Sequence, residues 1–130
     1  MGMLRIREPY VMSALLLTTD LATSSKVAGA ATRQGVPLAV AMSVEALCDK
    51  AAAGTWDLVI LDLGVAGLDL LTLVPRLRAL SNPPRAILAF GPHVHEALLA
   101  AAREAGCDTV VSRGQFHVQV DRILAGESAG

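Results

Sequence analysis

Several residues with reactive side chains stand directly after short apolar runs in this chain. Asp62 follows the run Leu58–Leu61, and the sequence Thr18-Thr19-Asp20 follows Ala14–Leu17. Short apolar runs of this kind are typical of buried strands, and α/β proteins gather their chemistry where such strands end. Carboxylates, hydroxyls, an imidazole and a guanidinium in one place can bind anions, form ion pairs or transfer protons. The residues that we expect at this shared edge are Thr18, Thr19, Asp20, Asp62, Gly91, His93, Ser112 and Arg113.

The polar stretch that begins at Thr18 has two interpretations. With Thr23 and Ser24 nearby, it forms a hydroxyl-rich turn ahead of a predicted helix. The free N–H groups and the dipole of a helix N-terminus attract anions, so a small anion or a nucleotide is one candidate ligand. N-capping by Asp20, Thr23 or Ser24 is the other interpretation. We favour it because these residue types are the preferred caps.

Three histidines, His93, His95 and His117, invite a metal assignment. His93 and His95 are two residues apart and face different directions in a helix, His117 belongs to a later helix, and no Cys or Glu clearly converges with them. We therefore expect structural or solvent-facing histidines and no metal site. His93 is expected to overlook the strand ends, where its titration near neutral pH would make it a sensor. We find no converging Ser, His and Asp, so we expect no enzyme activity.

The elements that position these residues alternate along the chain. Five apolar runs predict strands at Ala14–Leu17, Leu38–Ala41, Leu58–Leu61, Ala86–Phe90 and Thr109–Val111. Helical spacing and capping residues predict five helices, which run from the turn at Asp20 to Gly35, from Ser43 to Ala53, from Asp69 to Leu80, from Glu96 to Ala105 and from Phe116 to Leu124. Pro75 falls inside the third helix and predicts either a kink or a later start.

Five strand–helix pairs predict a three-layer α/β domain, with a five-stranded parallel sheet and helices on both of its faces. Right-handed crossovers favour the flavodoxin-like (βα)5 order. A length of 130 residues suits one domain. We expect this domain to span residues 10–125, with an N-terminal extension at 1–9 and a disordered tail at 126–130.

Composition argues against several functions. The net charge is −1 and there is no basic run, so nucleic acid is not an expected partner. The longest mainly apolar stretch, Leu58–Val74, contains Asp62, Asp69 and two glycines, and does not suit a membrane span. No secretory pattern follows the N-terminal charges. We therefore expect a cytoplasmic protein in which Cys48 and Cys107 are reduced.

In their order along the chain, residues 10–124 resemble the receiver domains of response regulators, the CheY-like family. The clearest segment is Trp56–Asp62, because the family places its phospho-accepting aspartate at the end of the third strand. Asp69 and the following Leu-Leu-Thr-Leu-Val are similar to the opening of the family's next helix, although Leu70 replaces a glycine. Ala100–Asp108 is similar to its fourth helix and the turn that follows. The resemblance implies a two-component signalling protein with Asp62 in the phospho-acceptor position.

The departures from the family change what the resemblance implies. Receivers hold Mg²⁺ with an acidic pair at the end of the first strand, and the matching positions here are the uncharged Thr18 and Thr19. The family's switch hydroxyl falls on Gly91, its aromatic partner on Val110 and its phosphate-pairing lysine on Arg113. Phosphoryl transfer depends on the metal and the cation more than on the nucleophile alone. The resemblance therefore implies a degenerate, pseudo-receiver type that uses no cofactor and is not expected to bind Mg²⁺.

An ion pair between Asp62 and Arg113 is the arrangement that we expect in place of the metal site. The implied function is that of a stand-alone signalling module, which acts by protein–protein interaction and without Mg²⁺-dependent phosphorylation. The alternative is an atypical response regulator that is phosphorylated on Asp62.

The implied partners are a histidine kinase, an output protein or a second copy of this chain in a homodimer. They would dock on the face made by the fourth helix, the fifth strand and the fifth helix. That predicted partner face carries His95, Leu98, Leu99, Ala102, Arg103, Val118, Gln119 and Arg122.

Overall fold

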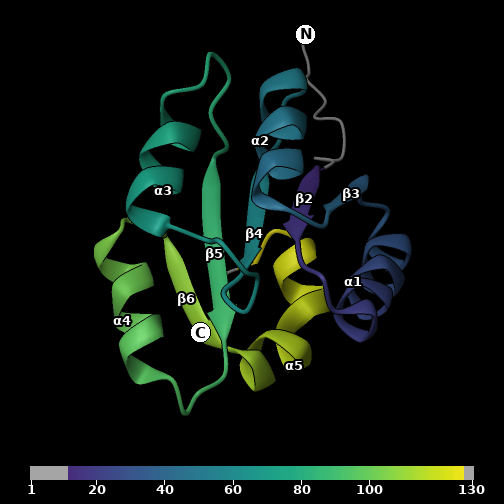
Figure 1. The fold of residues 1–130 in the computed structure, drawn as a ribbon. Helices are drawn as coiled ribbons and strands as arrows, with labels where there is room; N and C mark the ends of the chain where they lie inside the picture. The colour runs from purple at the N-terminus through teal and green to yellow at the C-terminus, as the bar shows by residue number, and fades with distance from the viewer. Residues whose placement is uncertain (1–11, 128–130) are drawn as a thin grey trace, which may run out of the picture.

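The computed structural model describes residues 12–127, which form one sheet between two layers of helices (Figure 1). The strands are β2 (Ala14–Leu17), β3 (Leu38–Ala41), β4 (Leu58–Asp62), β5 (Ala86–Gly91) and β6 (Thr109–Ser112). The helices are α1 (Leu21–Gln34), α2 (Val44–Ala53), α3 (Leu70–Arg78), α4 (Glu96–Glu104) and α5 (Arg113–Leu124).

All neighbouring strands run parallel, in the order β3-β2-β4-β5-β6. β4 lies at the centre, with Leu61 opposite Leu17 of β2 and Asp62 opposite Phe90 of β5. Because the strands are parallel, their carboxyl ends lie at one edge of the sheet, the carboxyl edge, and their amino ends lie at the opposite, amino edge. The expected flavodoxin-like fold is confirmed.

Side chains alternate across the sheet, so each central strand contributes to two cores. Leu58 and Ile60 of β4 pack with α1 and α5, whereas Val59 and Leu61 pack with α2, α3 and α4. Both faces of β4 are buried, as its continuous apolar run indicates. Asp62 is the next residue in the alternation after Leu58 and Ile60, so its side chain turns towards α1 and α5.

Most helix boundaries follow the predicted caps. α1 begins after its cap Asp20 and ends at Gly35, whose φ of 68° is the left-handed conformation that favours glycine. α3 begins directly after Asp69 and runs through Pro75, so the later start is not observed.

The expected start of the last helix at Phe116 is wrong. α5 begins at Arg113, because Ser112 and Gln115 form a capping box. The Ser112 hydroxyl accepts a hydrogen bond from the Gln115 backbone N–H, and the Gln115 side chain accepts one from the Ser112 backbone N–H. Arg113 is therefore the first residue of a helix rather than the end of a strand.

The two ends of the described chain lie at the amino edge. Beyond α5, the backbone N–H groups of Gly126 and Glu127 donate to the carbonyls of Ile123 and Arg122, so the expected disorder does not extend to these two residues. The predicted extension at 1–9 and the remaining tail at 128–130 lie outside the described residues. No helix within residues 12–127 is long and apolar enough to cross a membrane.

Candidate functional site

Asp62 is a buried carboxylate at the carboxyl edge, with a side chain that is 4% exposed. It closes β4, and hydrogen-bonded strands flank it on both sides. A charge in such a place is stable only when hydrogen-bond donors or a cation surround it. The site is therefore defined by the groups that compensate this carboxylate.

Three donors contact the two oxygens of Asp62. The Thr18 hydroxyl donates to Oδ2 at 2.7 Å. Arg113 Nη2 donates to Oδ1 at 3.0 Å, and the backbone N–H of Gly64 donates to the same oxygen at 2.9 Å. The predicted ion pair between Asp62 and Arg113 is confirmed.

The guanidinium of Arg113 is held by more than its charge. It lies over the Phe90 ring, with Cζ 5.1 Å from the ring centroid, and Phe90 in turn stacks on Phe116 at 4.3 Å between centroids. The capping box at Ser112 fixes the start of α5 and with it the backbone of Arg113. Sequence reasoning found Arg113 but missed these supports, although Ser112-x-x-Gln115 is a readable signal.

Asp20 caps α1, as the favoured interpretation of the turn predicts. Its Oδ1 accepts from the Ala22 N–H at 3.2 Å, and its Oδ2 accepts from the Thr23 hydroxyl at 2.6 Å. Arg113 Nη1 lies 3.7 Å from the same Oδ2. The Thr23 hydrogen bond is the main reason why the pKa of Asp20 lies below its ordinary value, and the Arg113 charge adds to this effect.

His117 joins the site from the first turns of α5. Its Nε2 lies 3.4 Å from the Thr23 hydroxyl oxygen, which also accepts from Arg113 Nη1 at 3.3 Å. Burial lowers the pKa of His117 below its ordinary value, and the positive charges of Lys26 and Arg113 lower it further. The sequence contains no local signal for this contact, because only the packing of α1 against α5 joins residues so far apart.

Thr23, His117 and Asp20 converge, a set that the expectation about Ser, His and Asp did not include. A nucleophilic hydroxyl should donate to the imidazole, with the carboxylate orienting the imidazole from its other side. Here the Thr23 hydroxyl donates to Asp20 instead, and Thr23 is fully buried. The arrangement is that of a hydrogen-bonded contact between helices and differs from that of a catalytic triad.

The other predicted site residues are placed around the site rather than in it. Thr19 is exposed. A Cβ added at Gly91 would lie 3.3 Å from Leu63 Cβ, so this position points to the α3/α4 side of the sheet, away from Asp62. His93 is exposed and lines a separate hollow of about 450 Å³ with Arg103 and Ser112, so its expected place over Asp62 is not observed.

The predicted partner face is only partly a surface. Leu99 and Ala102 are buried in the core against the sheet, so they are not available to a partner, and Leu98 is half-buried. The apolar side of α4 faces inwards because the helix must cover β5 and β6. The residues left at the surface are His95, Arg103, Val118 and Arg122, with Gln119 half-buried.

The donor set around Asp62 is sparse for a metal ion. Within residues 12–127, no group of three or more His, Cys, Asp or Glu side chains is placed to hold one. The Thr18 hydroxyl oxygen lies 2.7 Å from Asp62 Oδ2, and the Asp20 carboxylate is engaged at the α1 cap.

Comparison with known proteins identifies the fold. No protein-family model matches the sequence, and no match is found among curated proteins. Solved structures do match over nearly the whole chain. A chemotaxis response regulator of Vibrio cholerae is similar with a TM-score of 0.75 and 14% identity, over 88% of this chain and 97% of that one.

Two further solved structures are similar to this chain. The receiver domain of a sensor histidine kinase from Pseudomonas aeruginosa has a TM-score of 0.75 and 16% identity, over 88% of this chain and 95% of its own, and holds a magnesium ion in its active site cleft. A response regulator from Burkholderia multivorans has a TM-score of 0.71 and 25% identity, over 93% of this chain and 99% of its own. The chain thus has the fold of CheY-like response-regulator receiver domains.

Proposed function

We propose that this chain is a pseudo-receiver, a signalling module that acts by binding other proteins and does not undergo Mg²⁺-dependent phosphorylation of Asp62. The observation that carries the proposal is the closed donor shell of Asp62. Thr18 occupies one carboxylate oxygen, and Arg113 and Gly64 share the other. A carboxylate that attacks phosphorus must present a lone pair of one oxygen to the donor; Oδ1 already accepts two hydrogen bonds, and at Oδ2 the attack would compete with the Thr18 hydroxyl.

The residues around Asp62 do not fit Mg²⁺. Magnesium takes six oxygen ligands and is bound by carboxylates that offset its dehydration. Among the described residues, Asp62 supplies the buried carboxylate, Thr18 supplies a neutral hydroxyl, and the Asp20 carboxylate is held at the α1 cap, 3.7 Å from Arg113. The Arg113 guanidinium, 3.0 Å from Asp62, already neutralises the charge that would attract the cation.

The partner surface that we propose is the exposed part of the predicted face on α4 and α5. Arg103 lines the hollow of about 450 Å³ together with His93, Ser112 and Gln115, and so offers a recess with hydrogen-bonding walls. Val118 is exposed on the outer side of α5, close in sequence to Arg122. A protein partner that fits this surface would place a polar side chain in the hollow and an apolar one against Val118.

Intact-protein mass spectrometry after incubation with Mg²⁺ and acetyl phosphate tests the proposal. We expect no phosphoryl adduct on the wild type. A variant that restores two carboxylates, Thr18→Asp with Thr19→Asp, is expected to gain Mg²⁺ affinity, which calorimetry would detect. An adduct on the wild type that disappears in Asp62→Asn would refute the proposal and establish the atypical response regulator instead.

A further inference from the structure

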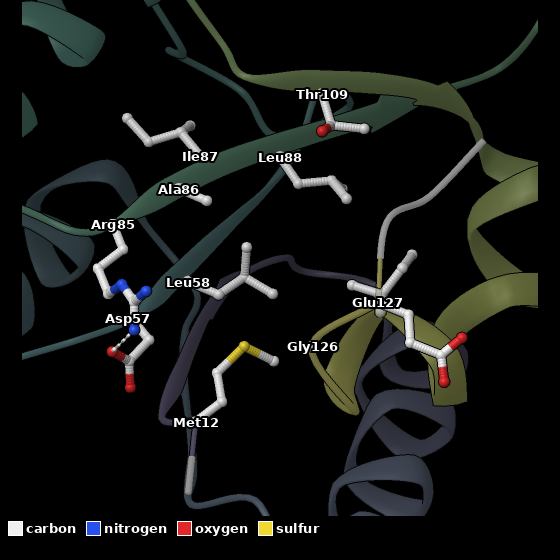
Figure 2. Close-up of a pocket in the computed structure, with 11 residues that line it drawn as sticks. Met12, Asp57, Leu58, Arg85, Ala86, Ile87, Leu88, Thr109, Gly126 and Glu127 are labelled. Carbon is white, nitrogen blue, oxygen red and sulfur yellow. Dashed lines mark ion pairs between the residues drawn. The ribbon is translucent and has the colours of Figure 1, made fainter. Parts of the chain in front are cut away.

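A pocket of about 330 Å³ lies at the amino edge of the sheet, opposite the end that carries Asp62. Figure 2 shows its lining, with the Asp57–Arg85 pair on one side and Glu127 on the other. The pocket lies between the first residues of β4, β5 and β6 and the turn that follows α5. Apolar side chains and polar ones both line it, so an occupant that fits has an apolar body and a polar tip.

The walls of this pocket belong to packed parts of the fold. Leu58 is 6% exposed, and Leu88 and Ile123 are each 4% exposed. The wall beyond α5 is fixed by the backbone N–H of Gly126, which donates to the carbonyl of Ile123. The pocket is therefore formed before any occupant binds, and an occupant need only supply the contacts.

Both ends of the described chain line the pocket, Met12 at one end and Glu127 at the other. Residues 1–11, which lie outside the described residues, join the fold at Met12 and so begin at the pocket itself. A segment attached this close has an effective concentration of about millimolar at the site. It therefore occupies the pocket ahead of a separate molecule of similar affinity.

The direction of the chain before β2 is set by contacts of the described residues. The backbone N–H of Ser13 donates to Asp57 Oδ2 at 2.9 Å, which holds this residue beside the start of β4. Met12, Ala14 and Leu16 all pack in the core that the sheet forms with α1 and α5. The alternation of an extended strand is therefore already established at Met12.

Continued towards the N-terminus, this alternation assigns Tyr10 to the same side of the chain as Met12. At about 3.3 Å per residue, the two residues are about 7 Å apart in an extended chain. Tyrosine combines a ring that buries about 150–250 Å² with a hydroxyl that requires a hydrogen-bond partner, and Thr109 and Glu127 offer such partners in the lining. Pro9 restricts the backbone directly before Tyr10 and so lowers the entropy lost on docking.

We propose that this pocket is the docking site of the chain's own N-terminal segment, with the Tyr10 ring on the apolar lining and the Tyr10 hydroxyl at the polar part. Docked in this way, the segment ties the beginning of the chain to the turn after α5. The inference goes beyond the proposed function and does not rest on it, because the pocket and Asp62 lie at opposite edges of the sheet.

Nuclear Overhauser effects in the full chain test the proposal without any substitution, because Tyr10 is the only tyrosine in the sequence. We expect these effects between the ring protons of Tyr10 and the methyl groups of Leu58, Leu88 and Ile123. The same methyl resonances are expected to be shifted upfield by the ring. A sample that mixes isotope-labelled and unlabelled chains separates contacts within one chain from contacts between two copies, and we expect contacts within one chain.

Three substitutions measure what the docking contributes to stability in urea unfolding. Tyr10→Ser removes the ring and is expected to raise the ratio of unfolded to folded protein about tenfold and to abolish the upfield shifts. Tyr10→Phe keeps the ring, and we expect it to change the ratio by less than about threefold. Val94→Ser is the matched control, because Val94 is 70% exposed in a connection at the other edge, and it should change the ratio by no more than about twofold.

Three results would overturn the inference. The first is the absence of Overhauser effects from Tyr10 to the pocket methyl groups in the wild type. The second is a Tyr10→Ser protein as stable as the Val94→Ser control. The third is a set of contacts that arise only between chains, which would assign the pocket to a second copy. A phosphoryl adduct on Asp62 would refute the proposed function and leave this result unaffected.

Discussion

The two ends of β4 each carry an aspartate paired with an arginine, but the pairs differ in kind. At the carboxyl edge, Asp62 is 4% exposed and lies 3.0 Å from Arg113, which is 31% exposed. At the amino edge, Asp57 is 21% exposed and lies 3.9 Å from Arg85, which is 69% exposed. The first pair is buried and hydrogen-bonded, whereas the second is an electrostatic contact that water screens.

The surroundings of the pairs explain the difference. Figure 2 shows the Asp57–Arg85 pair at the side of a pocket of about 330 Å³ whose lining includes Met12, Leu58 and Leu88. Asp57 also accepts from the backbone N–H and the hydroxyl of Ser13, so it ties β2 to β4 without needing the arginine. Because Asp62 is buried, water cannot compensate its charge, and the carboxylate depends on its three hydrogen-bond donors. The same two residue types therefore form a surface ion pair at the amino edge and, at the carboxyl edge, a buried ion pair on which the fold depends.

Removing the arginine of the buried pair should have the largest effect. Arg113→Ala leaves the Asp62 carboxylate buried without its cation, and we expect it to lower the free energy of unfolding by about 3 kcal/mol. Urea unfolding followed by circular dichroism measures the loss. Asp62→Asn in the Arg113→Ala background should recover part of it, because the uncompensated charge is then gone. An Arg113→Ala protein as stable as the wild type would show that Asp62 does not depend on this pair.

Removing the hydroxyl on the other carboxylate oxygen should cost somewhat less. Thr18→Val keeps the shape of the side chain but leaves Asp62 Oδ2 without its donor, and we expect a loss of about 2 kcal/mol. Thr19→Val is the matched control, since Thr19 is exposed, and should change stability by less than about 0.5 kcal/mol. Equal effects of the two substitutions would argue that the Thr18–Asp62 hydrogen bond contributes nothing.

The cap that positions Arg113 should contribute about 1 kcal/mol. Ser112→Ala removes the acceptor of the Gln115 N–H and frays the start of α5. Ser43→Ala removes a similar cap from α2 and is the control. We expect both to lose comparable stability, but only Ser112→Ala should speed amide exchange at Gly64, whose N–H shares Asp62 with Arg113. Identical exchange at Gly64 in both variants would contradict the positioning role of the cap.

Acid should loosen the contact between α1 and α5. The pKa of His117 is lower in the folded protein than its ordinary value, so the contribution of His117 to stability is present above about pH 6.5 and is lost as the pH falls through the folded pKa. Asp20 also contributes stability that is lost on acidification, but at lower pH, because the pKa of its carboxyl group is lowered as well. NMR titration of the His117 ring and urea unfolding between pH 8 and 5 measure the effect. His117→Gln should flatten the pH dependence in this range, and an unchanged slope would rule out this source.

The smallest effect is expected at the amino edge. Arg85→Ala removes a long, exposed ion pair, and we expect a change in the free energy of unfolding below about 1 kcal/mol. Urea unfolding alongside Arg113→Ala compares the two pairs directly. Equal losses would contradict the contrast between a surface pair and a structural one.

Much of the fold could be predicted because the local signals are strong. β2 and β3 occupy the predicted residues, and Gly35 ends α1 where a left-handed residue is needed. Asp62 stands at the end of β4, and its pairing with Arg113 could be predicted because both residues stand at strand ends on the same edge of the parallel sheet, with β5 between their strands. For the strands and the end of α1 the deciding pattern is short and lies within one element, whereas the ion pair follows from the shared edge at which parallel strands end.

Apart from the start of α5, where a local capping box was missed, the errors come from patterns that need two elements. The expectation that Leu99 lies at the surface is wrong because helical spacing alone does not say which side of α4 covers the sheet, and Leu99 is buried. The position of His93 after β5 predicts a place over Asp62, but the turn carries His93 towards α4. The meeting of Thr23 with His117 depends on the packing of α1 on α5, which no local sequence feature reports.

The sequence by itself therefore determined the alternation of strands and helices, the parallel sheet and the residues that reach its carboxyl edge, because periodicity and capping act over a few residues. The sequence also predicted that Arg113 pairs with Asp62, but only the tertiary structure decided that Thr18 and Gly64 complete the compensation of this buried charge. Thr18, Gly64 and Arg113 come from three different connections, and their donors meet at one carboxylate only after the strands have paired. Compensation of a buried charge requires distances near 3 Å between groups far apart in the chain, and packing alone sets such distances.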